Sequence, residues 1–221
     1  MTPRVDPFHE KVARIALAVA DRYGFVLGGG LALILHGALQ RPTEDIDLFG
    51  PETASVVAAA EAVRAALREA GLRVADVPAE SRLDDVIDGL DYFMAEMIAY
   101  PGAGTDGAVR LSLGHLERTM SPVVLDVGPA MAMPDLIAWK VAALVNRAEE
   151  RDFVDVAEFL RDQDADALLA MARRVDPALE EEDVARAGRR LDRTPDAAFA
   201  RYGLDRTQSA RLRERFSGWP R

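Results

Sequence analysis

Cysteine is absent from this 221-residue chain, and histidine and lysine are rare. Without cysteine there are no disulfides, no thiolate catalysis and no cysteine-ligated zinc or iron–sulfur sites. The three histidines, His9, His36 and His115, stand at unrelated spacings, which argues against a zinc site built from them. Lys11 and Lys140 are the only lysines beside 25 arginines, so Lys140 is a position to examine closely.

A membrane-spanning run is also missing. The longest uncharged stretch, between Arg22 and Arg41, almost reaches spanning length but contains several glycines, a histidine and a glutamine. A buried strand, turn and helix explain that stretch better than a membrane helix does. The first ten residues lack the basic start and apolar core of a signal peptide. We therefore expect a cytoplasmic protein without a membrane partner.

The formal net charge of −10 argues against a general nucleic-acid coat, but the charge is unevenly spread. Residues 186–221 hold ten arginines against four acidic residues, a net of +6, which leaves −16 for residues 1–185. Such asymmetry can mark a polyanion-binding tail on an acidic body. It is equally typical of a helical face that neutralises its own acidic partner, and both interpretations stay open.

Hydrophobic periodicity predicts two structural halves. The first half alternates helices and strands, predicted over residues 7–23 (helix), 25–27 (strand), 31–39 (helix), 44–49 (strand), 51–69 (helix) and, as extended segments, 74–77, 92–100, 109–113 and 123–127. Helices are predicted over residues 135–147, 151–161, 166–174, 180–191 and 206–216. The expected class is α/β (α+β), with an α/β core over residues 1–130 and a helical subdomain over 131–221.

A glycine turn and two aspartates form the most informative pattern. Gly29 and Gly30 end a short apolar strand and open a helix. Glycine lets the backbone approach a ligand closely, and free amides at a helix start favour phosphate. In the next strand Asp45 and Asp47 are two residues apart, so they project from the same face while Ile46 points to the other.

Two carboxylates side by side repel each other unless a cation lies between them. Mg²⁺ suits that position because it prefers oxygen ligands, is held by one or two carboxylates, and completes its shell with water and substrate phosphates. Mn²⁺ is the alternative cation. A phosphate-holding turn beside such a pair predicts phosphoryl or nucleotidyl transfer. Each feature alone has a structural explanation, a tight turn or a solvated strand edge; their combination in an apolar strand favours a site.

The same segment resembles the first motif of the AbiEii/AbiGii-type nucleotidyltransferases, which belong to the DNA polymerase β-like superfamily. The resemblance rests on Gly29-Gly30-x-Ala32, His36-Gly37 and Arg41-x-Thr43-x-Asp45-x-Asp47-Leu48. It implies a polymerase β-like core with a mixed sheet, a triphosphate held by Gly29 and Gly30, and metals bound by Asp45 and Asp47. A serine is common in the superfamily where this chain has Gly30, so one hydroxyl contact to phosphate is lost and the backbone amides remain.

Three further residues of this motif have open roles. Arg41 either contacts phosphate and orients the site or caps the preceding helix, and Thr43 fits the nucleotide-binding pattern. His36 lies on an apolar helix, which favours a packing histidine over a catalytic one.

A second constellation combines two cations and two acids. Lys140 and Arg147 are seven residues apart on one helix face, and Asp152 and Asp155 are three apart on a helix. These four residues could form only an internal salt-bridge network. The segment also resembles the family's second signature, Lys-x-x-Ala-Leu-x-x-Arg-x-x-x-Arg-Asp-x-x-Asp. That resemblance implies that Lys140 contacts nucleotide phosphate and that Arg147 belongs to the nucleotide-binding residues. It also implies that Asp152 and Asp155 orient Lys140 and Arg147 or approach the metal site.

The superfamily usually places a third carboxylate on a neighbouring strand. Glu96 and Asp126 are the two candidates, because each lies in an apolar segment where a buried acid is costly. The order of motifs favours Glu96.

The sequence thus predicts a Mg²⁺-dependent nucleotidyltransferase that moves an NMP group from an NTP to an acceptor. The resemblance adds that family members include toxins of toxin–antitoxin pairs, some of which modify tRNA, so that tRNA or another RNA is a candidate acceptor and an antitoxin a candidate partner. One alternative is a small-molecule nucleotidyltransferase of the aminoglycoside type, which the acidic body would suit. Another is a catalytically silent module that binds a nucleotide or a protein.

Overall fold

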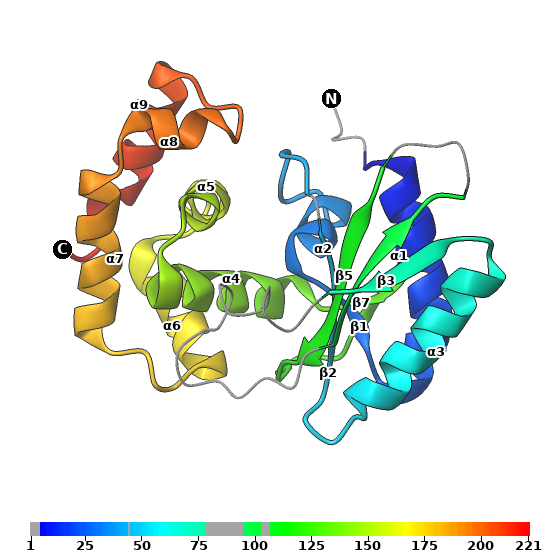
Figure 1. The fold of residues 1–221 in the computed structure, drawn as a ribbon. Coiled ribbons are helices and arrows are strands. Elements are labelled where there is room, and N and C mark those ends of the chain that lie inside the picture. The colour runs from blue at the N-terminus through cyan, green and yellow to red at the C-terminus, as the bar shows by residue number, and fades with distance from the viewer. Residues whose placement is uncertain (1–4, 44, 78–94, 103–106) are drawn as a thin grey trace. The chain divides into compact units, whose positions relative to one another are not determined.

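The computed structural model describes residues 5–43, 45–77, 95–102 and 107–221, and these residues divide between two compact units. The N-terminal unit comprises Met1–Ala132 and the C-terminal unit Met133–Arg221. In the ribbon the first unit is built of a sheet with helices and the second of helices (Figure 1). Among the described residues, no helix is both long and apolar enough to cross a membrane.

The N-terminal unit is organised by one mixed sheet with the strand order β3-β4-β5-β2-β1-β7-β6. Its strands are β1 (Val26–Gly28), β2 (Asp45–Gly50), β3 (Arg73–Asp76), β4 (Ala95–Tyr100), β5 (Val109–His115), β6 (Val123–Leu125) and β7 (Gly128–Ala130). The central strand β2 runs parallel to β5 and antiparallel to β1. Strand β4 is antiparallel to β5, so residues from β1, β2, β5 and β4 form continuous rows across the sheet.

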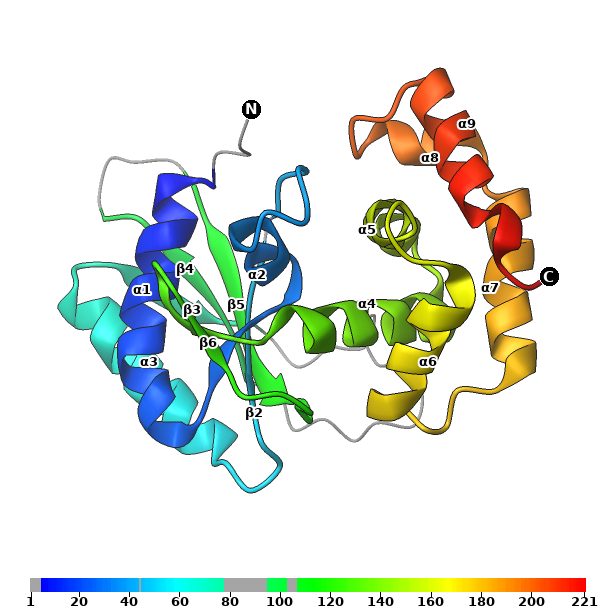
Figure 2. The same cartoon turned by 180° about the vertical axis from the view of Figure 1, so that it is seen from behind.

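Helices α1 (Pro7–Ala20) and α3 (Val56–Glu69) lie side by side on one face of the sheet (Figures 1 and 2). Asp6 caps α1, since its carboxylate accepts a hydrogen bond from Phe8 N at 2.7 Å, and a short 3₁₀ helix (Asp21–Tyr23) follows. Side-chain burial alternates along strand β2: Ile46 and Leu48 are fully buried, and Asp45 and Asp47 at the alternate positions are half-buried. The apolar face of the sheet is thus sealed and the polar face is left for the site.

Helix α2 (Gly29–Leu35) is shorter than the predicted helix over residues 31–39 and starts two residues earlier. It ends because Gly37 adopts a left-handed backbone with φ of +80°, and Ala38 N donates to Leu33 O at 2.9 Å. Glycine takes this conformation without the penalty that a side chain would meet, and the bond pattern closes a helix C-terminus.

Two other boundaries differ from the prediction. Helix α3 begins at Val56 rather than at Pro51, because the Ser55 hydroxyl accepts from Ala58 N at 3.2 Å and caps it there. The segment 123–127 was expected to be one strand. It ends at Leu125, turns at residues 126–127 and returns as β7, which pairs with β1. Of the predicted strand 92–100, residues 92–94 lie outside the described part of the chain.

The C-terminal unit is helical, with α4 (Met133–Arg147), α5 (Glu150–Phe159), α6 (Ala165–Val175), α7 (Glu181–Arg193), α8 (Asp196–Ala200), α9 (Arg206–Arg215) and a 3₁₀ turn η3 (Phe216–Gly218). Helix α4 packs on α5, α6 and α7. An aromatic cluster fixes the end of the chain: the ring centroids of Phe153 and Phe216 are 5.7 Å apart, and those of Phe216 and Trp219 are 5.3 Å apart. Trp219 Nε1 also donates to Val184 O at 3.1 Å. Helix α5 is thereby tied to the C-terminus.

Candidate active site

One row of residues crosses four strands at the centre of the sheet. Gly28 pairs with Asp47, Asp47 with Ser112, and Ser112 with Glu96. Residues paired directly across strands project from the same face. Asp47, Ser112 and Glu96 therefore share one face, and Asp45, two residues from Asp47, lies on it as well. This confirms the prediction that the two aspartates project together.

We call this surface the acid face and define it by Asp45, Asp47, Glu96, Arg110 and Ser112. Arg110 belongs to it because it pairs in register with Asp45. The opposite face is covered by α1 and α3, whereas α2 lies on the acid-face side (Figure 1). Charged residues therefore gather where the two helices do not seal the sheet.

Gly29 and Asp47 are in direct contact. Gly29 has a φ of +60°, and a Cβ built on it would lie 1.8 Å from Asp47 Oδ2 and 2.7 Å from Asp47 Cγ. Any side chain at position 29 would displace the carboxylate, so the glycine is required both for its backbone and for its lack of a side chain. The structure thus brings the predicted phosphate-holding turn and one predicted metal ligand together.

Gly30 is approached by the two other residues of the motif. A Cβ on Gly30 would lie 3.0 Å from Thr43 Oγ1 and 3.7 Å from an Arg41 guanidinium nitrogen. The other terminal nitrogen of Arg41 donates to Pro42 O at 3.0 Å, which turns the guanidinium back over the start of α2. Arg41 and Thr43 therefore place a cation and a hydroxyl beside the glycine turn.

Glu96 is buried, with 5% of its surface exposed, and its Oε2 has no hydrogen-bond partner in the described part of the chain. A buried carboxylate oxygen without a donor costs free energy, and at this position on the acid face it points to a ligand or proton as its partner. Two strand spacings, about 9.6 Å between Cα atoms, separate Glu96 from Asp47 in the row.

Asp126, the other candidate for the third acid, was expected within a buried strand, and that expectation is wrong. It lies exposed in the turn between β6 and β7, where Arg14 donates to its carbonyl oxygen. The β6–β7 hairpin is on the far side of β1 from β5 and β4. A polar residue suits this turn, because water solvates its carboxylate.

His36 was expected to be a packing residue. Its Nε2 lies 3.0 Å from the carbonyl oxygen of Met131, which requires this nitrogen to be the donor. The ring therefore ties the end of α2 to the strand region around β7.

The acid face fits a cation held partly by substrate. No group of three or more His, Asp or Glu side chains converges as a metal cage within residues 5–43, 45–77, 95–102 and 107–221. Two neighbouring carboxylates, with water and phosphate oxygens completing the shell, are what Mg²⁺ takes in phosphoryl-transfer sites. Asp45 and Asp47 supply that donor set.

The second predicted constellation is assembled within the C-terminal unit. Lys140 Nζ lies 3.0 Å from Asp155 Oδ2 and 3.7 Å from Asp152 Oδ1. Arg147 makes a two-pronged contact with Asp152, with donor–acceptor distances of 2.9 and 3.0 Å. Both acids are fully buried, and the Lys140 side chain is 11% exposed. The acids thus hold the two cations in place.

Asp152 remains ionised despite its burial. Burial would raise its pKa, but the hydrogen bond from Arg147 and the charges of Lys140, Arg147 and Arg151 outweigh that effect and lower the pKa below its ordinary value. The carboxylate is therefore a permanent anion at neutral pH.

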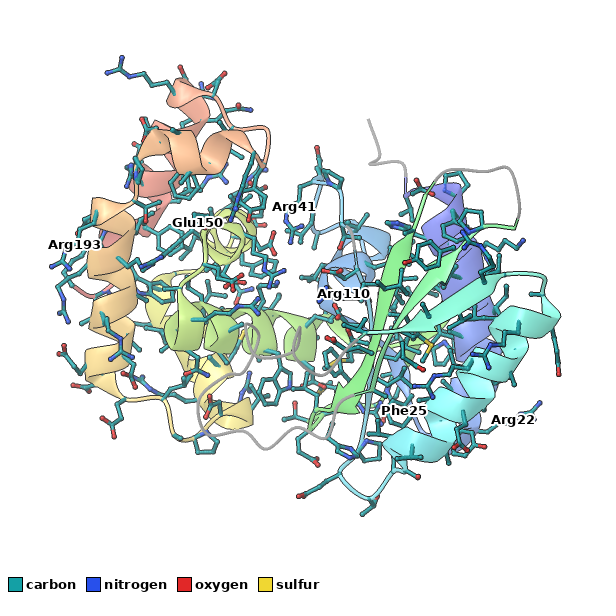
Figure 3. All side chains as sticks on the ribbon, in the orientation of Figure 1. Arg22, Phe25, Arg41, Arg110, Glu150 and Arg193 are labelled. Atoms are coloured by element: carbon teal, nitrogen blue, oxygen red, sulfur yellow. The ribbon has the colours of Figure 1, made fainter. Side chains whose placement is uncertain are left out.

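Most arginines of the basic tail are engaged within the C-terminal unit. Six of the ten form ion pairs, among them Arg201 with Glu150, Arg215 with Glu158 and Arg221 with Asp192. Figure 3 labels Glu150 on α5 and Arg193 on α7. The unit as a whole carries 16 basic and 18 acidic residues, a net charge of −2. The tail therefore largely neutralises its own acidic neighbours.

Sequence reasoning missed Arg110 and Ser112. Both lie in the predicted strand over residues 109–113, at alternate positions among buried Val109, Leu111 and Leu113. Polar residues at every second position in an apolar strand were the available signal. Their side of the sheet could be assigned only with the pairing register to β2.

One protein family matches almost the entire sequence. The match covers residues 12–218, and the family is described as "Nucleotidyl transferase AbiEii toxin, Type IV TA system". A comparison with curated proteins found no match.

Two solved structures share the fold. The crystal structure of JHP933 from Helicobacter pylori is 15% identical, with a TM-score of 0.59 over 96% of this chain and 91% of that protein. MenT4, a nucleotidyltransferase toxin from Mycobacterium tuberculosis, is 19% identical, with a TM-score of 0.55 over 95% of this chain and 82% of MenT4. The predicted α/β nucleotidyltransferase fold is thus confirmed.

Proposed function

Because the chain belongs to the AbiEii nucleotidyltransferase toxin family and is a nucleotidyltransferase, we propose that it moves an NMP group from an NTP to an acceptor hydroxyl, with a divalent cation held by Asp45 and Asp47. The observation that carries this proposal is the contact between Asp47 and Gly29, which joins the acid pair to the glycine turn. Phosphate and cation sites in contact are the arrangement that nucleotidyl transfer needs.

The divalent cation, Mg²⁺ or Mn²⁺, would neutralise charge that develops on the phosphate oxygens. The residues of this chain then bind and orient the nucleotide. The backbone amides of Gly29 and Gly30 cradle phosphate, and Arg41 and Thr43 add a cation and a hydroxyl beside them. Held in this way, the α-phosphate faces the acceptor in a fixed orientation, which accounts for much of the rate gain in such reactions.

The acceptor oxygen attacks the α-phosphorus, a new P–O bond forms, and the bond from that phosphorus to the β-phosphate oxygen breaks. Pyrophosphate leaves with the bonding electron pair. Glu96 is assigned as the base that accepts the proton of the acceptor hydroxyl. Its Oε2 is buried on the acid face, without a hydrogen-bond donor in the described part of the chain. Asp126 is not assigned this role.

Lys140 is assigned to neutralise negative charge on the phosphates of the nucleotide. An ammonium group is a compact point charge that suits phosphate, and its position is fixed by Asp155 at 3.0 Å. Asp152 and Asp155 are assigned to orient Lys140 and Arg147 within the C-terminal unit. Both acids are fully occupied by cations, which argues against a direct role for them as metal ligands.

RNA, with tRNA the first candidate, is the proposed acceptor, as the motif resemblance implies. A cognate antitoxin is the proposed regulator, because the family is described as a toxin of a type IV toxin–antitoxin system. The charge distribution limits how such an acceptor would bind. The C-terminal unit is close to neutral, and most of the arginines in residues 186–221 are paired internally. We therefore expect few phosphate contacts, and a shallow dependence of RNA affinity on salt.

The test is incubation with each NTP labelled on its α-phosphate, Mg²⁺ and total RNA, comparing wild type with Asp47→Ala. We expect label in RNA only with wild type. A parallel reaction replaces RNA with an aminoglycoside. Transfer there and not to RNA would favour the small-molecule alternative, which the net charge of −8 in residues 1–132 would suit. Nucleotide binding without any transfer would favour a silent binding module, and equal labelling by both proteins would refute the metal assignment.

A further inference from the structure

Arg110 is a charged residue on the acid face that lies outside both sequence motifs. It pairs in register with Asp45, so its side chain projects from the same face as Asp45 and Asp47. Adjacent strands are about 4.8 Å apart, which places the two residues as direct cross-strand neighbours. Figure 3 labels Arg110 and Arg41 on the side of the sheet where α2 lies.

The position of Arg110 is unusual for an arginine. Its neighbours Val109 and Leu111 are 1% and 0% exposed, and Arg110 itself is half-buried. Removing a guanidinium from water is costly unless an anion compensates it. Asp45 is one such anion, but Asp45 also belongs to the pair assigned to the cation. When that cation is bound, Asp45 shares its charge with the cation, and an arriving anion can compensate Arg110 in its place.

The order of the strands shows where that anion would lie. Strand β2, with both aspartates, is flanked by β1, which leads into Gly29 and Gly30, and by β5, which carries Arg110. Cationic groups thus stand on both sides of the carboxylate pair, Arg41 beside Gly30 and Arg110 beside Asp45. An extended polyanion that crosses β2 can contact both sides, whereas a single phosphate cannot.

We propose that Arg110 binds the polyphosphate of the nucleotide from the β5 side. The planar guanidinium offers paired N–H donors that match phosphate oxygens. This assignment rests on the proposed function and deepens it, because it gives the site a contact that distinguishes a triphosphate or pyrophosphate from a monophosphate. A residue that only balanced the charge of Asp45 would make no such distinction.

The test compares Arg110→Met and Arg110→Lys with wild type and with Arg68→Met as a matched control. Arg68 is an exposed arginine near the end of α3, the helix that covers the opposite face. Binding of NTP, inorganic pyrophosphate and NMP is measured by calorimetry in the presence of Mg²⁺, after thermal melting has shown which variants are folded.

We expect Arg110→Met to weaken NTP and pyrophosphate binding about 10- to 100-fold, the range for hydrogen bonds to charged groups. NMP binding should change less than about twofold, because an NMP lacks the further phosphates that Arg110 would contact. Arg110→Lys should be intermediate because it keeps the charge and loses the paired donors. Arg68→Met should match wild type.

Unchanged NTP and pyrophosphate binding by a folded Arg110→Met or Arg110→Lys protein would overturn the assignment. Equal weakening of NTP, pyrophosphate and NMP would do so as well, since it would indicate a distorted site. Either result, with transfer by wild type intact, leaves the proposed function standing. A wild-type protein that neither binds NTP nor transfers NMP would refute both the assignment of Arg110 and the proposed function.

Discussion

The carboxylate of Asp47 occupies the space that a side chain on Gly29 would need, with 1.8 Å between Asp47 Oδ2 and a Cβ at position 29. This contact couples the backbone of the glycine turn to the carboxylate that we propose as a metal ligand. The two motif elements are eighteen residues apart in the sequence, and the antiparallel pairing of β1 with β2 brings them together. A substitution at either residue is therefore expected to alter the position of the other.

Replacement of Gly29 by alanine should lower both stability and activity. The left-handed backbone costs an alanine about 1–2 kcal/mol, and the clash with Asp47 adds about 1–3 kcal/mol. A displacement of Asp47 by about 1 Å should reduce transfer roughly 100-fold or more. Urea unfolding and transfer assays measure the two effects. The control is Gly71→Ala, at a φ of +80° with open space around it, which should show the backbone cost alone.

A double-mutant cycle isolates the contact itself. The stability cost of Gly29→Ala should be smaller in an Asp47→Ala background by at least about 1 kcal/mol, because the clashing carboxylate is gone. Strictly additive effects would show that the two residues do not share this space.

Comparing Glu96→Gln with Asp126→Asn should show which of the two acids is the third carboxylate of the site. The amide keeps the size of the side chain and removes its ability to accept a proton, so transfer should fall about 100- to 10,000-fold. Stability should stay within about 1 kcal/mol of wild type or rise, since a buried charge without a described donor is removed. Asp126→Asn, in an exposed turn, should leave both quantities unchanged. If Asp126→Asn lost activity and Glu96→Gln kept it, the assignment of Glu96 would be wrong.

Lys140 and Asp155 allow a structural role to be distinguished from a role in phosphate binding. Lys140→Met should destabilise the protein by about 3–5 kcal/mol, because it removes the cation that lies 3.0 Å from the buried carboxylate of Asp155. The double variant Lys140→Met with Asp155→Leu should recover much of that stability and still fail to transfer NMP. Arg161→Met removes a cation from the more exposed pair with Glu158 and serves as the control, with a cost of about 1 kcal/mol or less.

The outcome of that double variant is decisive for Lys140. Recovery of activity together with stability would mean that Lys140 only neutralises Asp155. Denaturant unfolding followed by circular dichroism, beside the transfer assay, provides both quantities on the same preparation.

The depressed pKa of Asp152 predicts a specific acid sensitivity. A carboxylate whose pKa is lower in the folded state stabilises that state fully above its unfolded pKa of about 3.9. The stabilisation is lost as the pH falls through the folded value. Asp152→Asn should therefore be less stable than wild type by about 3 kcal/mol at neutral pH, since it leaves Lys140 and Arg147 less compensated.

This difference should hold from pH 7 to pH 5 and shrink below pH of about 3.9. Urea unfolding of both proteins at a series of pH values measures it. A difference that stayed constant to the lowest pH at which the fold survives would contradict the ion-pair account.

The shared face of Asp45 and Asp47 could be predicted from the sequence because the relevant geometry is local. Strand alternation alone puts Asp45 and Asp47 on one face, and helix spacing alone puts Lys140 and Arg147 on one side of α4. The helix boundaries that were wrong depended on caps: Ser55 starts α3 later than Pro51 suggested, and the turn at Gly37 ends α2 early.

What could not be predicted depends on register between strands. Nothing local in the sequence says that Ser112 lies between Asp47 and Glu96, or that Arg110 lies beside Asp45. Asp126 illustrates the opposite error, since an apolar run around it suggested a buried strand where the chain makes an exposed turn into β7. The strand β7, with a glycine and a proline among its three residues, carries too weak a pattern to be recognised.

The most direct test of the central claim follows the fate of individual phosphates. Parallel reactions of wild type and Asp47→Asn receive an NTP labelled on the α-phosphate or on the γ-phosphate, with Mg²⁺ and RNA. We predict that wild type places α-label in RNA and γ-label in released pyrophosphate, and that Asp47→Asn, still folded, does neither. γ-Label in the acceptor, or undiminished α-label transfer by Asp47→Asn, would contradict a nucleotidyl transfer centred on Asp45 and Asp47.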